Sequence, residues 1–157
     1  MRSTPPSRSR LAAVTTIIVI VVTGCGSDPQ SRLRDAAEKA VESDTSFSLR
    51  TVVKGSWTRV YVFGAYQTPA DARDRMGFDW PDAADKLPQD DGSALLVFVN
   101  GTQVVQAFEP ELNVGCLEFR KGIRAAETRL RVEDFDGARN LYLASGAVNR
   151  SSCERSG

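Results

Sequence analysis

Residues 57–66 read WTRVYVFGAY, and this stretch decides the fold because aromatic and β-branched side chains occupy odd and even positions alike. Residues of these types are enriched in β-strands. Apolar side chains at both parities indicate a strand that is covered on both faces, as an inner strand of a sheet is. We therefore expect an inner strand over residues 57–66.

A β-hairpin is predicted further along the chain. Residues 95–108 read LLVFVNGTQVVQAF, in which two β-type runs, 95–99 and 103–108, flank Asn100-Gly101. Asn and Gly tolerate the positive φ that a two-residue hairpin turn requires. The sequence thus favours two antiparallel strands joined at this dipeptide.

Two helices carry signals at their ends. Residues 29–43 follow Asp28, which is placed to cap, and begin with Pro29, which suits the first helical position. Their apolar residues recur at the spacing of a single helical stripe: Leu33, Ala36, Ala37, Ala40 and Val41. A short second helix is predicted between Thr68, its N-cap, and Gly77, which ends it.

The remaining strand signals rest on alternation. A half-buried strand is predicted over residues 47–53. A second hairpin is predicted from residues 128–135 to residues 140–144, with Asp136-Gly137 at its turn. Residues 117–119 are a candidate edge strand.

Hairpin-joined strands, with helices gathered early in the chain, favour an α+β domain. The connections are too short for parallel crossovers, so the strands should pair antiparallel. Residues 81–93 are acidic and bounded by proline, as a surface loop with room for one helical turn would be. We expect an N-terminal amphipathic helix and a short second helix packed on one side of an antiparallel sheet.

The first 25 residues resemble the export signal of a bacterial lipoprotein. Three arginines precede an uncharged apolar run, residues 11–22, which has the length of a signal peptide, whereas a spanning helix needs about twenty residues. Residues 22–25, VTGC, fill the four lipobox positions, so Cys25 is the predicted site of a diacylglyceryl group. The alternative is an ordinary cleaved signal or a short membrane anchor.

This interpretation divides the chain into a signal peptide at residues 1–24, a lipidated N-terminus with a short tether at residues 25–28, and a single domain at residues 29–157. Two acyl chains would hold Cys25 stably at the extracytoplasmic face of the cell membrane. The 133 residues from Cys25 onward carry 17 basic and 20 acidic side chains, a net charge of −3. This balance argues against nucleic acid as a partner.

The two other cysteines, Cys116 and Cys153, would meet an oxidising compartment after export, where such a pair commonly forms a disulfide. The alternative is two separately buried thiols. The chain has no His, and two thiols alone do not complete a zinc site, so no metal site and no cofactor are predicted.

The middle third of the chain resembles a loose family of small, uncharacterised bacterial exported proteins and lipoproteins. The shared pattern is a Trp, an alternating strand, a Tyr before a Thr-capped helix, then Gly and Trp, with an apolar hairpin after it. Here it falls on Trp57, Val60, Tyr61, Val62, Phe63, Tyr66, Thr68, Gly77, Trp80 and residues 95–105. The family often has Pro where this chain has Ala65. The resemblance implies a shared small fold and no established activity.

The sequence lacks histidine, the side chain that most often acts as a general base in catalysis. Without His, Ser-His-Asp and Cys-His mechanisms are excluded. The carboxylate pairs Asp90/Asp91 and Asp134/Asp136 lie at predicted turns, where Asp commonly bonds to local backbone. We therefore predict no catalytic residue.

Two groups of side chains are candidates for binding. An aromatic group could line a pocket for a lipid or small ligand, or else form packed core: Trp57, Tyr61, Tyr66 and Trp80. A basic group could lie against anionic headgroups or an acidic partner, or else be a solvated hairpin face: Arg120, Lys121, Arg124, Arg129 and Arg131.

These observations predict a membrane-anchored exported lipoprotein that acts as a non-catalytic binding module for an envelope protein or a ligand. One alternative is an exported hydrolase-type enzyme that uses carboxylates, which convergent carboxylates in a cavity would favour. The other is a carrier of lipids or small ligands, which an open cavity lined by the aromatic group would favour.

Overall fold

A computed structural model describes residues 28–112, 122–135 and 138–144. Several predicted features lie outside these ranges and are not placed: the signal peptide, Cys25, the Cys116–Cys153 disulfide, the candidate strand at residues 117–119, Arg120, Lys121 and the turn at residues 136–137.

The N-terminal helix is confirmed as α1, Pro29–Glu42. Its cap is the Asp28 carboxylate, which accepts hydrogen bonds from the backbone N–H groups of Gln30 (2.9 Å) and Ser31 (3.0 Å). Most of the apolar stripe is buried or partly buried, and Leu33 and Ala37 are almost fully covered. Val41, at the end of the stripe, is instead exposed. The helix therefore packs through its first three turns.

A central antiparallel sheet contains the expected inner strand. It consists of β2 (Arg59–Gly64), β3 (Ala94–Asn100), β4 (Gln103–Phe108) and the two-residue β5 (Ile123–Arg124), in the order β4-β3-β2-β5. Four consecutive residues of β2 are buried, so both of its faces are covered. We call these four strands the central sheet.

The hairpin between β3 and β4 is confirmed, with its turn one residue later than predicted. Asn100 pairs with Gln103, so the turn is Gly101-Thr102, with a φ of +59° at Gly101. This sign suits a glycine at the first turn position. A β-bulge lies further along β4, where Val99 pairs with Val104 but Phe98 pairs with Gln106. Val105 is therefore the extra residue.

The second predicted helix is α3, Pro69–Met76, and the one-turn helix in the following loop is α4, Ala83–Lys86. Thr68 and Asp71 form a capping box in which each side chain accepts from the backbone N–H of the other, at 3.2 and 2.7 Å. Gly77 ends α3 in the left-handed region at φ +80°. These local signals explain why the sequence predicted both ends of α3.

The predicted strand over residues 47–53 is wrong. Only Phe47–Ser48 is extended, as β1, and the chain then forms the one-turn helix α2, Leu49–Val52. The Ser48 side chain caps α2 by accepting from the backbone N–H of Arg50 at 3.2 Å. Leu49, Val52 and Val53 are buried, which is the i, i+3, i+4 spacing of a helix and not strand alternation.

The second hairpin is confirmed, but it belongs to a separate sheet. Strands β6 (Arg129–Phe135) and β7 (Ala138–Leu143) pair antiparallel, and β1 adds to β6 to give the order β1-β6-β7. A 3-10 turn, η1 (Ala125–Glu127), leads from β5 into β6. The described chain thus holds two antiparallel sheets where one was expected, and the α+β fold class is confirmed.

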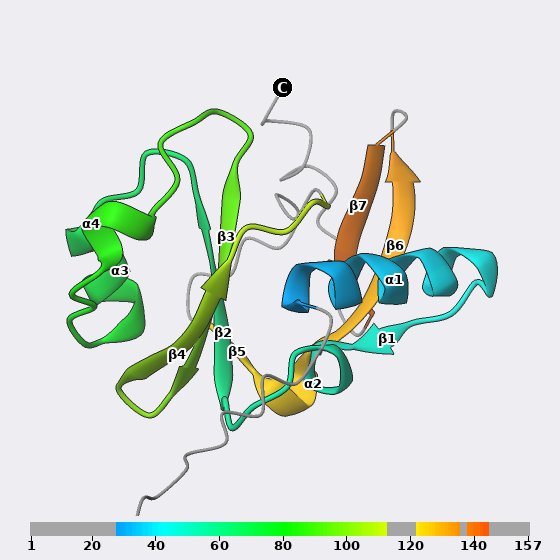
Figure 1. The fold of residues 1–157 in the computed structure, drawn as a ribbon, viewed down its shortest axis with the longest axis horizontal. Helices are drawn as coiled ribbons and strands as arrows, with labels where there is room; N and C mark the ends of the chain where they lie inside the picture. The colour runs from blue at the N-terminus through cyan, green and yellow to red at the C-terminus, as the bar shows by residue number, and fades with distance from the viewer. Residues whose placement is uncertain (1–27, 113–121, 136–137, 145–157) are drawn as a thin grey trace, which may run out of the picture.

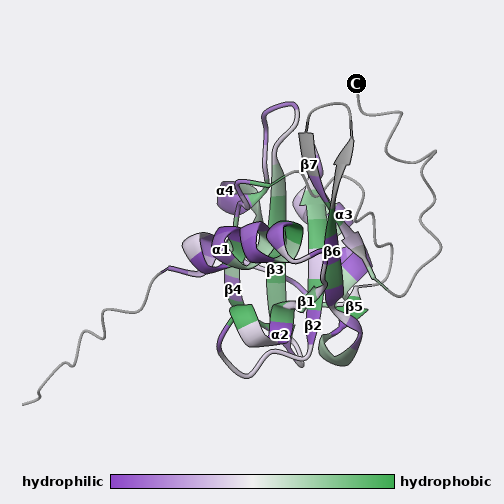
Figure 2. Ribbon diagram, turned by 90° about the vertical axis from the view of Figure 1, so that its right-hand side faces the viewer, coloured by the Kyte–Doolittle hydropathy of each residue, from purple (hydrophilic) through white to green (hydrophobic). Residues whose placement is uncertain are grey.

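The layers bury two cores, one on each face of the central sheet (Figure 1). Helices α3 and α4 cover one face and pack on Tyr61, Phe63 and the inward residues of β3. On the other face, α1, α2 and the β1-β6-β7 sheet enclose a second core around Val60 and Val62. Figure 2 shows the central strands mostly in hydrophobic green and the outer surface of α1 mostly in hydrophilic purple.

Among the helices described, none combines the length and apolar content needed to cross a bilayer.

Gly122, the residue before β5, gives a test of how closely the chain packs against the Tyr61 ring. Gly122 has a φ of +68°, and an added Cβ would lie 2.6 Å from the Tyr61 ring. We expect Gly122→Ala to lower the free energy of unfolding by about 1–3 kcal/mol, because the ring must move and the backbone is strained. Gly64→Ala is the control, since its Cβ would meet nothing within 4 Å. Equal urea midpoints for the two variants would contradict this account.

Candidate functional site

The four candidate aromatic side chains do not meet around one cavity. Trp57 belongs to the core between the two sheets, whereas Tyr61 and Trp80 belong to the core under α3 and α4. Tyr66 lies in the turn after β2 with 62% of its surface exposed. The central sheet therefore separates Trp57 from Tyr61 and Trp80, and Tyr66 belongs to neither core.

Trp57 is fully engaged as a core residue. Its indole N–H donates to the Val53 carbonyl at 3.0 Å, and its ring meets Phe98 edge-on with centroids 5.0 Å apart. The Arg50 guanidinium lies 5.3 Å from the ring centroid and donates to the carbonyls of Gly55 and Trp57. These contacts fix the loop between α2 and β2.

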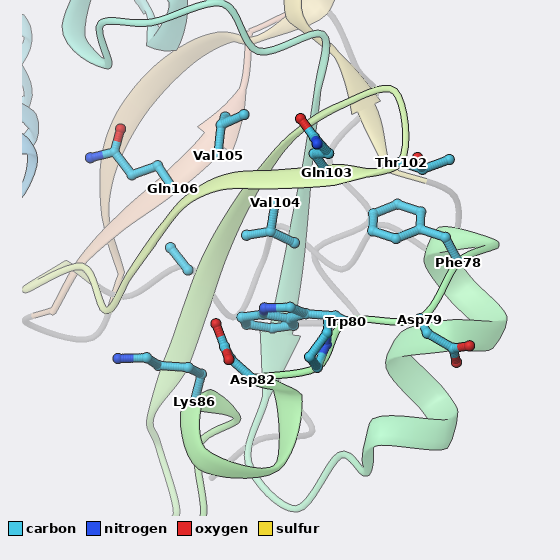
Figure 3. Close-up of a pocket in the computed structure, with 12 residues that line it drawn as sticks. Phe78, Asp79, Trp80, Asp82, Lys86, Thr102, Gln103, Val104, Val105 and Gln106 are labelled. Atoms are coloured by element: carbon cyan, nitrogen blue, oxygen red, sulfur yellow. The ribbon is translucent and has the colours of Figure 1, made fainter.

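An open groove of about 570 Å³ lies beside β4 (Figure 3). One wall is an unbroken run of the hairpin, residues 102–107, and the other comes from residues 78–82 with Lys86. Val104 points toward the Trp80 indole, whereas Val105 and Gln106 project to the other side of the strand. Two carboxylates, Asp79 and Asp82, stand at the groove, which we call the β4 groove.

The candidate basic group is divided in the structure. Arg124 lies in the central sheet and forms an exposed ion pair with Glu127, three residues later. Hydrogen bonding to Arg124 lowers the pKa of Glu127, so this carboxylate stays ionised and compensates the arginine. Arg129 and Arg131 lie together on β6, in the other sheet.

Arg129 and Arg131 meet at an open hollow of about 640 Å³ beside the connection from α1 to β1. The hollow is lined by two arginines, one carboxylate residue, two hydroxyl residues and four apolar residues: Arg129, Arg131, Asp44, Thr45, Ser46, Ala40, Val41, Val132 and Ala144. We call it the arginine hollow. The Nε–H of Arg129 donates to the Ser46 hydroxyl oxygen at 2.6 Å, which anchors this exposed side chain to the connection. Arg131 is half-buried and lines the same open hollow as Arg129, on the side of β6 opposite the buried Leu130.

The α1–β1 connection is shaped by local backbone chemistry. The backbone N–H of Thr45 donates to the Ala40 carbonyl at 2.9 Å, which closes the end of α1. Asp44 adopts a φ of +48°, a region that Asp tolerates better than most residues. Sequence reasoning missed Asp44, Thr45 and Ser46 as site residues. The polar run SDTS at residues 43–46 signals a turn, but not that β6 lies beside it.

The arginine hollow sets two guanidinium groups against the one carboxylate of Asp44, and this excess of positive charge favours anion binding. Guanidinium groups recognise carboxylate and phosphate oxygens with several N–H donors in a fixed fork, and the hydroxyl groups of Thr45 and Ser46 add further donors. The apolar side chains of Val41 and Val132 extend the same surface. Within the described ranges, no three Cys, Asp or Glu side chains come together as metal ligands would.

Comparisons with protein-family models, with curated proteins and with solved structures gave no match. The resemblance to exported lipoproteins therefore stays a prediction.

The Arg124–Glu127 pair predicts a pH effect. Because the folded-state pKa of Glu127 is lowered from 4.5, its contribution to stability is present above about pH 4.5 and is lost as the pH falls through the folded value. Glu127→Gln should therefore flatten the decline of thermal stability between about pH 5 and pH 3. Glu38→Gln, on the exposed face of α1, serves as the control. Parallel melting-temperature profiles for Glu127→Gln and the wild type would rule out the pairing.

Proposed function

We propose that the protein is a lipid-anchored, non-catalytic binding module at the extracytoplasmic face of the cell membrane, and that its arginine hollow contacts anionic headgroups. The observation that carries the proposal is the meeting of Arg129 and Arg131 in one open hollow with the hydroxyl side chains of Thr45 and Ser46. The lipobox at residues 22–25 supports the anchor.

The position of the hollow sets how the domain would lie on the membrane. The predicted tether, residues 25–28, leads directly into α1, and the hollow lies at the opposite end of this helix. Fourteen residues of α-helix span about 20 Å at 1.5 Å per residue. Anchor and hollow can then both reach the headgroups if α1 lies nearly parallel to the membrane surface.

Charge elsewhere on the domain favours the same orientation. Residues 68–93, which include α3 and α4, contain seven Asp and only three basic residues. These helices lie across the central sheet from the β1-β6-β7 sheet, at the opposite side of the molecule (Figure 1). An anionic membrane would repel this layer, which we call the acidic layer, and attract the arginine hollow.

The anchor is tested by Cys25→Ser. We expect the wild type to partition into the detergent phase and Cys25→Ser to partition into the aqueous phase, because two acyl chains hold a protein in the membrane stably. Ser27→Ala, two residues away, is the control and should partition like the wild type. Equal detergent-phase fractions for Cys25→Ser and the wild type would refute lipidation at this position.

The contact with headgroups is tested on the Cys25→Ser background, so that the acyl chains do not mask it. Arg129→Glu changes the surface charge by two units, and each unit is worth about 1 kcal/mol near an anionic membrane. We expect binding to phosphatidylglycerol-containing vesicles at 50 mM salt to weaken roughly 30-fold, with little difference at 0.5 M salt, where charges are screened.

Arg73→Glu is the matched control, because Arg73 is an exposed arginine of α3 in the acidic layer. It makes the same change in net charge away from the hollow and should weaken vesicle binding far less. A thermal melt of each variant establishes that the fold is retained. Equal losses for Arg73→Glu and Arg129→Glu would mean that net charge, and not the arginine hollow, governs binding.

A further inference from the structure

The outer edge of the central sheet is open along β4. Among the described residues, β4 pairs only with β3, and no other backbone group forms a hydrogen bond with it. An edge strand leaves alternate N–H and C=O groups unpaired, and soluble proteins commonly protect such strands with charge, proline or a β-bulge. Residues 103–108 of β4 contain no charge and no proline, and the bulge at Val105 is the one such feature in this strand. The backbone of β4 can therefore pair with another extended chain.

The β4 groove follows this edge, which is the geometry that strand addition uses. Six consecutive hairpin residues, 102–107, line one wall, so a strand laid beside β4 would run along the groove. Its alternate side chains would face the apolar surface formed by Phe78, Trp80 and Val104. In known strand addition, backbone hydrogen bonds give affinity and such alternate pockets give specificity.

The bulge at Val105 keeps this surface in place. Because the bulge adds one residue, Ala107 faces the core under α3 and α4, while Phe108 faces the other core and stacks on Phe98 with centroids 5.6 Å apart. Without the extra residue, every side chain after it would change face. Val105 itself remains 46% exposed at the open edge.

The charge around the β4 groove indicates which kind of chain would bind there. The acidic layer carries a net charge of −4. At the groove itself two carboxylates, Asp79 and Asp82, stand with one ammonium group, Lys86, and Asp79 also lies 4.0 Å from the Arg73 guanidinium. The groove therefore keeps a local excess of negative charge, to which Asp82 contributes most directly. Asp82 is the N-cap residue of α4 but its side chain makes no capping bond, so its carboxylate is not used to hold that helix. Two copies joined edge to edge about a two-fold axis would place two acidic layers on the same side of the joined sheet, where they repel.

We propose that the β4 groove binds an extended, basic peptide segment of a partner protein, which adds to the central sheet as a strand beside β4. This surface is separate from the arginine hollow and from the lipid anchor, so it does not depend on the proposed membrane contact.

The test uses the full chain in a non-ionic detergent and two acetylated, amidated ten-residue peptides. One alternates Lys with Val and Thr, and the other carries Glu in place of every Lys. Calorimetric titration at 50 mM salt should show binding of the Lys peptide and little binding of the Glu peptide. Hydrogen exchange should slow at the alternate amides of residues 103–108 that do not pair with β3 when the Lys peptide is bound, because strand pairing protects them.

Matched variants locate the site. Val105→Lys places a charge on the open edge and should abolish measurable binding, whereas Ala70→Lys adds the same charge on the exposed surface of α3 and should preserve most of it. Asp82→Asn should weaken the Lys peptide about fivefold, the upper range for an exposed ion pair. Asp74→Asn, whose carboxylate is exposed on α3 outside the groove, should have a much smaller effect.

Three results would overturn the proposal. Equal affinity for the two peptides would contradict the claim that the groove selects a basic segment. Binding without slowed exchange in β4 would contradict the claim that the peptide pairs with β4 as a strand. A dimer that forms without peptide and is broken by Val105→Lys would show that a second copy occupies the edge.

Discussion

Burial of β2 on both faces is the constraint on which the rest of the structure depends. Val60 and Val62 lie on one face of this strand, and Tyr61 and Phe63 lie on the other. Burying both pairs of apolar side chains requires other elements to pack on each face. One core therefore forms under α3 and α4, and the other forms against α1, α2 and the β1-β6-β7 sheet. The central sheet becomes a partition between two halves of the molecule.

Features fixed by neighbours in sequence could be predicted, and features fixed by distant contacts could not. The caps at Asp28 and Thr68 and the turn at Gly101 act within a few residues, so their signals are readable. Residues 47–53 fit a strand by alternation and a helix by the spacing of Leu49, Val52 and Val53. The hydrogen bond from the Leu49 N–H to the Thr128 carbonyl, at 3.0 Å, lies between segments far apart in sequence.

The same reasoning explains the candidate site. The sequence singled out Arg129 and Arg131 because basic residues cluster there, but it joined them to Arg124, which the fold places in a different sheet. Ser46 belongs to the arginine hollow only because β1 pairs with β6. Likewise, Trp57 and Tyr61 are close in sequence and similar in chemistry, yet the central sheet separates them.

The pairing of β1 with β6 also bears on when the chain can fold. Phe47 lies opposite Leu130, about 80 residues later, and α1 packs against the same late strand. Contacts so distant in sequence close slowly. The apolar stripe of α1 can pack on α2 early, but its cover is complete only when β6 is available. For a chain threaded through a translocation channel from its N-terminus, this order would delay native structure until nearly the whole chain has been synthesised. The topology would thereby keep the polypeptide competent for transport.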